Sequence, residues 1–138
     1  MNKSSPVLQA LVLADHIYTD EGSSKRIICG TFSKISCLSF PAIYNQTTWV
    51  FVLLVDVTGE INLQFRFVSL ANDEILMQSS PIKIQALDKL TPLDIAIQIP
   101  PFPLPRAGIY SFECYADGTM IGSVRLNVEL LKQEERNG

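Results

Sequence analysis

The feature that most constrains the fold is a pair of alternating segments near the C-terminus, separated by the turn dipeptide Asp117-Gly118. Before the turn, apolar side chains occupy every second position at Tyr110, Phe112 and Cys114, and after it they recur at every second position from 124 to 130. Successive side chains of a β-strand point to opposite faces, so each segment predicts a strand with one buried face. Glycine accepts a positive φ and aspartate tolerates turn geometry. The pattern therefore predicts a closing β-hairpin.

The parity of this hairpin decides how its loop is built. A plain two-residue loop places Phe112 opposite Ser123, and residues directly opposite each other share a face, so a buried position meets a polar one. A three-residue loop, Ala116-Asp117-Gly118, restores the match and is the arrangement that we expect. A two-residue turn followed by a bulge at Gly122 restores the parity as well.

Short alternating or apolar segments recur along the rest of the chain at a spacing of about ten residues, with turn-forming residues between them. Residues 49–57 are apolar on both faces, as expected of a central strand. Residues 33–48 break any periodicity and predict a loop with at most one short strand. Residues 100–105, PPFPLP, lack the N–H donors that a sheet interior needs, so they are expected to connect one sheet to the other. The expected strands are 7–14, 25–32, 49–57, 61–67, 75–77, 82–85, 95–99 and the two arms of the hairpin.

These segments predict an all-β fold, with two antiparallel sheets packed as a sandwich, immunoglobulin-like or related, of about eight strands. The chain has 138 residues, a length typical of one domain, which we expect to span residues 1–131 and to be followed by a charged tail at 132–138. Hydrophobic residues make up 47% and charged residues 18%, against about 25% charged in an average domain. This excess indicates a large core or a face covered by a protein partner or a second copy.

Composition also argues against several classes of partner and compartment. The net charge is −3 and the basic residues are scattered, so nucleic acid is not an expected partner. The longest apolar run, residues 49–55, is much shorter than the roughly 20 residues of a membrane-spanning helix. The three cysteines are odd in number and lack metal spacing, which predicts reduced thiols in the cytoplasm. Cys29 and Cys114 are expected in the core, and Cys37 is expected to be exposed.

The densest group of potential ligands is Asp15, His16, Asp20 and Glu21, which we expect in the loop after the first strand. Carboxylates and an imidazole within a few residues of one another can hold a divalent cation if the loop curls around it. Turns at strand ends are also rich in acidic residues because these cap backbone groups, which is the interpretation that we prefer. Because His16 is the only histidine, any histidine-assisted catalysis has to use it. No cofactor-binding motif is found.

The order of features is similar to that of a family of small bacterial proteins known as a domain of unknown function. The matching motifs are Ala14-Asp15, KRIICGTF at 25–32, GEINLQFRFV at 59–68 and the closing segment 105–128. The resemblance implies a compact immunoglobulin-like or related β-sandwich and carries no activity, so no functional residues are transferred. Residues 108–112 also resemble a tyrosine corner, with Phe112 where an immunoglobulin domain has its second cysteine.

The sequence therefore favours a non-enzymatic binding or structural module that acts through protein–protein contacts or self-association. The alternative is a small metal-dependent enzyme or metal-binding protein that uses Asp15, His16, Asp20 and Glu21. The sequence alone does not decide whether the protein is an enzyme.

Overall fold

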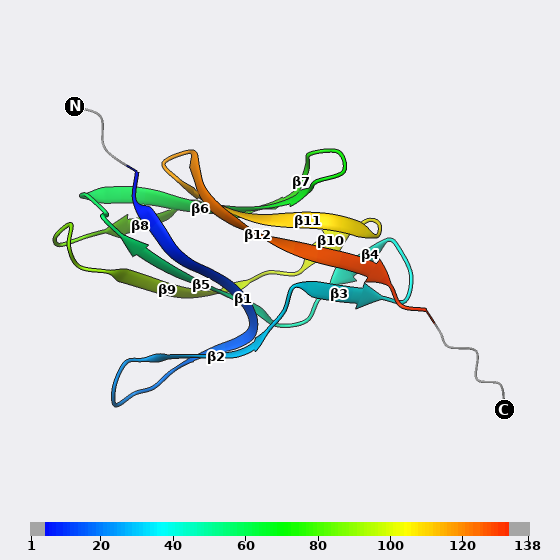
Figure 1. Cartoon of the computed structure of the whole chain (residues 1–138), viewed down its shortest axis with the longest axis horizontal. Coiled ribbons are helices and arrows are strands. Elements are labelled where there is room, and N and C mark those ends of the chain that lie inside the picture. Colours follow the sequence, from blue (N-terminus) through cyan, green and yellow to red (C-terminus); the bar gives the residue numbers. More distant parts are fainter. Residues whose placement is uncertain (1–4, 133–138) are drawn as a thin grey trace.

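The computed structural model describes residues 5–132, and its regular structure there is entirely β (Figure 1). The prediction of an all-β fold is confirmed. The expectation of two sheets with about eight strands is not confirmed, because the described residues form twelve strands in three sheets. The strands are β1 Val7–Thr19, β2 Arg26–Thr31, β3 Lys34–Cys37, β4 Ala42–Tyr44, β5 Thr48–Val55, β6 Glu60–Ser69, β7 Glu74–Gln78, β8 Ile82–Gln85, β9 Leu93–Ile99, β10 Phe102–Leu104, β11 Gly108–Ala116 and β12 Thr119–Leu130.

Two large sheets form two layers around one core (Figure 1). The four-stranded sheet has the order β2-β1-β5-β9. The six-stranded sheet has the order β3-β12-β11-β6-β7, and β8 pairs with β6 beside β7. Val50, Val52 and Leu54 of β5 are fully buried in the same cluster as Phe65 and Phe112 of the opposite layer. Burial of these alternating side chains is the main force that holds the two layers together.

The β11–β12 hairpin closes with a two-residue turn, so the expected three-residue loop is wrong. Ala116 pairs with Thr119, and both turn residues have positive φ, 49° at Asp117 and 82° at Gly118, as in the turn type that matches strand twist. The register then shifts so that Cys114 lies opposite Gly122. The parity argument holds, but the structure satisfies it by the alternative of a two-residue turn and a bulge.

A contact with β6 explains why the shorter turn is adopted. The Asn62 backbone N–H donates to Asp117 Oδ1 at 2.8 Å, and the Asp117 N–H donates to the Asn62 carbonyl at 2.9 Å. The turn is therefore hydrogen-bonded to the neighbouring strand at both backbone and side chain. This partner is 55 residues away in the chain, beyond the reach of local turn rules.

The tyrosine corner expected at residues 108–112 is present. Tyr110 is 1% exposed, and its hydroxyl donates to the Arg106 carbonyl at 2.6 Å. The ring of Tyr110 stacks on Phe67 with centroids 5.1 Å apart. This bond anchors the connection into β11 to the core.

The proline-rich segment carries the chain from β9 to β11, as expected, but it also forms strand β10. Pro103 lies opposite Ile43 in a two-stranded sheet of β10 and β4. Proline is tolerated there because each of the two strands is an edge. Residues 33–48 also contain two short strands, β3 and β4, where at most one was expected, and β3 pairs parallel to β12.

Six of the seven residues of the charged tail expected at 132–138 lie outside the described part of the chain. Among residues 5–132, no helix is long and apolar enough to cross a membrane.

Candidate functional site

The residues expected in the first loop lie in a strand and a turn. β1 continues through Thr19, so Asp15 and His16 belong to it, and only Asp20 and Glu21 lie in the turn. β1 is longer than expected because it changes partners instead of ending: it pairs with β5 up to Ala14 and with β2 from Ala14 to Thr19. The second pairing could not be recognised from the apolar run alone.

Asp20 is engaged by its own turn. Its Oδ2 accepts hydrogen bonds from the Ser23 backbone N–H at 2.9 Å and from the Ser23 hydroxyl at 2.6 Å. These bonds favour the ionised carboxylate and lower the pKa of Asp20. The Asp20 carbonyl also accepts from the Ser24 N–H, and Ser24 has a φ of 60°. Asp20 therefore caps the β1–β2 turn, in line with the preferred interpretation.

Asp15 and His16 are held in separate surroundings. The Asp15 carboxylate lies over Gly30, whose φ of 76° and missing Cβ make room for it. The His16 ring stacks on Tyr18 with centroids 5.5 Å apart. Within residues 5–132, no group of three His, Cys, Asp or Glu side chains is placed to hold a metal ion.

The burial of the three cysteines differs from the expectation based on the sequence. Cys114 is buried in the core as expected, and burial raises the pKa of its thiol to about 12. Cys29 is exposed, so its expected core position is wrong, and it lies opposite His16 in the β1–β2 ladder. Cys37 lies in β3 and is partly buried, and desolvation raises the pKa of its thiol. The pairing of His16 with Cys29 depends on strand register, which sequence reasoning did not specify.

The β1–β2 hairpin curls over the outer face of the four-stranded sheet. β2 and β9 lie at opposite edges of this sheet, yet Arg26 Nε is 3.3 Å from Asp94 Oδ2. Such a contact requires the hairpin to bend across β5, and Figure 1 shows β2 in a separate layer beyond β5 and β9. A cavity of about 540 Å³ lies between them, with an apolar floor that includes Phe51 and Leu53 and with Arg26 and Asp94 at its rim.

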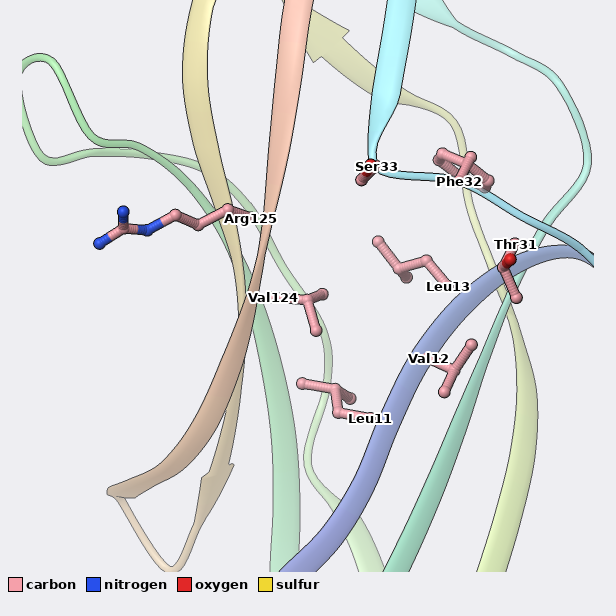
Figure 2. A pocket seen from close by; sticks show the side chains of 8 residues that line it. All are labelled: Leu11, Val12, Leu13, Thr31, Phe32, Ser33, Val124 and Arg125. Carbon is pink, nitrogen blue, oxygen red and sulfur yellow. The ribbon is translucent and has the colours of Figure 1, made fainter.

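A second cavity, of about 280 Å³, lies between β1 and β12. Figure 2 shows Leu11 and Leu13 pointing toward Val124, whereas Arg125 points away on the far side of β12. Further along the same two strands, a Cβ on Gly122 would overlap Leu8. The edges of β1 and β12 therefore approach each other and close this side of the two layers.

The strongest candidate for a binding surface is an apolar patch at the end of the molecule that carries β3 and β4. It consists of Leu38, Ile43, Leu130 and Leu131, which are 70%, 68%, 51% and 50% exposed. Leu38 and Ile43 line one hollow of about 320 Å³, and Leu130 and Leu131 line another of about 450 Å³. Leu130 lies opposite Cys37, whose carbonyl accepts from the Leu131 N–H at 2.7 Å. Strand pairing therefore holds Leu130 and Leu131 beside the end of β3, next to Leu38.

The sequence was compared with models of known protein families, and one model matches most of the chain. Residues 9–129 match the model of a family described as a family of unknown function (DUF6941). The chain belongs to this family. The match extends from β1 into β12, so the domain of unknown function inferred from the sequence motifs is confirmed. The family description carries no activity or functional residues. A search of curated proteins found no match.

Proposed function

We propose that this domain is a non-enzymatic binding module that acts through protein–protein contacts, and that the patch of Leu38, Ile43, Leu130 and Leu131 is its contact surface. The observation that carries the proposal is the exposure of these four side chains, each at least half open to solvent. Single exposed apolar residues are common, but several such residues gathered at the ends of neighbouring elements are typical of a protein-binding surface.

The chemistry of the patch suits a protein partner. Lys34 Nζ and Glu129 Oε1 form an ion pair at 2.7 Å beside it, which supplies a charged rim to an apolar centre. Fully burying one leucine or isoleucine side chain contributes about 1.5–3 kcal/mol relative to leaving it exposed. Because each of the four is already partly covered, together they would contribute several kcal/mol to association.

The scaffold and compartment belong to the same proposal. We describe the fold as an immunoglobulin-like or related β-sandwich, supported by the two packed layers and by the Tyr110–Arg106 bond. Folds of this kind commonly present loops and strand ends to partners. We place the protein in the cytoplasm, because the three cysteines are free thiols.

The metal-dependent alternative has no specific observation in its favour. Asp20 caps the turn with Ser23, and His16 stacks on Tyr18. These engagements give both side chains a structural role.

The test compares a patch variant with a matched surface variant. Leu38→Asp with Ile43→Asp adds two charges to the patch, and Leu87→Asp with Leu90→Asp adds two at fully or largely exposed leucines elsewhere. Proteins that co-purify with the wild-type chain are identified, and the dissociation constant of the purified partner is measured for each variant. We expect a loss of at least about tenfold for the patch variant alone. Equal binding by both variants, or no specific partner for the wild type, would refute the proposal.

A further inference from the structure

The strand β9 has an open edge. It pairs with β5 and with no other strand in the described part of the chain. Edge strands expose unpaired N–H and C=O groups, and proteins usually protect them with prolines, lysines, bulges or short strands. β9 has seven residues without any of these devices. Its neighbouring prolines, Pro92 and Pro100, lie outside it, and its single charge, Asp94, is ion-paired with Arg26.

The other strand edges are shorter, interrupted or covered. β3 has only four residues. β7 and β8 are separated by residues 79–81, which include a proline. On the far side of the two layers, the free edges of β1 and β12 approach each other, with Leu8 over Gly122. β9 thus presents an uninterrupted apolar edge that the fold itself does not cover.

The sequence of β9 allows the strand to pair antiparallel with a second copy of itself so that like side chains meet. It reads LDIAIQI, centred on Ala96. In an antiparallel pair of two copies centred there, Ile95 lies opposite Ile97, Leu93 opposite Ile99, and Asp94 opposite Gln98. Residues directly opposite each other share a face, so apolar side chains meet apolar ones on the inner face of both sheets. No charge meets a like charge. The strand therefore fits a second copy of itself in a two-fold arrangement.

The space between the two large sheets is also open to solvent beside β9. An apolar cavity of about 80 Å³ lies between the two large sheets, lined by Met77 of β7 and by Ile97 and Ile99 of β9 together with Phe65 and Phe112. Leu93, Ile95 and Ile97 are only partly buried. A strand added beside β9 would cover these side chains and close the opening, which gives a hydrophobic contribution in addition to the backbone hydrogen bonds.

We infer that two copies of this chain pair antiparallel through β9, about a two-fold axis at Ala96, and so join their four-stranded sheets into one continuous sheet. This surface is separate from the patch of Leu38, Ile43, Leu130 and Leu131, and each dimer retains two such patches. Two linked patches raise the effective concentration for a partner that carries repeated contact sites.

A designed disulfide tests the register directly. Ala96 lies opposite its own copy, at a Cα separation of about 4.5–5.5 Å in an antiparallel ladder, which a disulfide can span. In a Cys29→Ser, Cys37→Ser background, Ala96→Cys is expected to form a covalent dimer on mild oxidation. The control is Gln98→Cys in the same background. Two copies of Gln98 are displaced by four residues, or roughly 14 Å, so this variant is expected to stay monomeric on a non-reducing gel.

A charge pair tests the same register without a covalent bond. Gln98→Lys places a cation opposite Asp94 of the second copy at two symmetric positions, and Gln98→Glu places an anion there. Cross-strand pairs of this kind should strengthen the dimer for the lysine variant and weaken it for the glutamate variant, each by roughly 2- to 30-fold in dissociation constant. Both changes are at an exposed side chain, so folding is preserved. Sedimentation equilibrium measures the dissociation constant.

The outcomes separate this inference from the proposed function. Light scattering is expected to give twice the 15.4-kDa mass of the chain. A monomer at several hundred micromolar, or a dimer that Ala96→Cys does not link, would overturn the inference. Neither result alters partner binding by the Leu38 and Ile43 surface, which the patch variant tests on its own.

Discussion

Removal of the Tyr110 hydroxyl should lower the free energy of unfolding, because this single group makes a buried hydrogen bond. The hydroxyl is the donor to the Arg106 carbonyl at 2.6 Å, on a side chain that is 1% exposed. Tyr110→Phe keeps the ring and its stacking on Phe67 but leaves the carbonyl without this donor. Loss of one partner of such a buried bond costs about 1–2 kcal/mol. For a domain of this length, that corresponds to a decrease in Tm of about 3–8 °C.

Tyr115→Phe provides the matched control for this prediction. The Tyr115 hydroxyl donates to Glu113 Oε1 at 2.8 Å on the outer face of the same strand, where water can replace the lost bond. Its ring keeps its contact with Arg66, whose guanidinium lies 4.4 Å from the ring centroid. We expect a loss below about 0.5 kcal/mol for this variant. Urea unfolding with a common m-value measures both changes. Equal losses for the two variants would show that the corner bond does not contribute as argued.

The remaining predictions concern pH and thiol chemistry. Because hydrogen bonds from Ser23 hold the pKa of Asp20 below its ordinary value of 3.8, the stability that Asp20 provides is present above that pH and is lost as pH falls through the lowered pKa. The difference in urea midpoint between wild type and Asp20→Ala should therefore be larger at pH 7 than at pH 2, and a constant difference would contradict the role of the carboxylate. Burial and a pKa of about 12 should keep Cys114 unlabelled by a maleimide at neutral pH, whereas exposed Cys29 reacts. Peptide mass spectrometry identifies the labelled site, and labelling of Cys114 in the folded protein would contradict its burial.

The strand pattern was predictable wherever one face of a segment is buried and the other is polar. Residues 61–67 and 82–85 lie in β6 and β8, and Phe65, Phe112 and Leu126 are buried as the alternation requires. The short strands β3, β4 and β10 were not predictable in this way. β4 and β10 have three residues each, too few for a periodic signal, and all three strands depend on partners elsewhere in the chain.

For the candidate sites too, only features that depend on local sequence were predictable. The capping role of Asp20 follows from local turn chemistry and was one of the two interpretations that the sequence supported. The apolar patch was not predictable, because the parallel pairing of β3 with β12 places Leu38 near Leu130 and Leu131, and the pairing of β4 with β10 places Ile43. Nothing in the local sequence of residues 34–43 indicates these pairings.

The amino-acid sequence by itself determined the all-β class, the alternation of buried side chains and the parity of the closing hairpin, because each depends on the two-residue period of a single strand. The tertiary structure alone decided which edges remain open, where the β1–β2 hairpin folds and which apolar side chains stay exposed. These features depend on contacts such as Arg26 with Asp94, between residues far apart in the chain. Their energies arise only once both layers are assembled, so no local pattern encodes them.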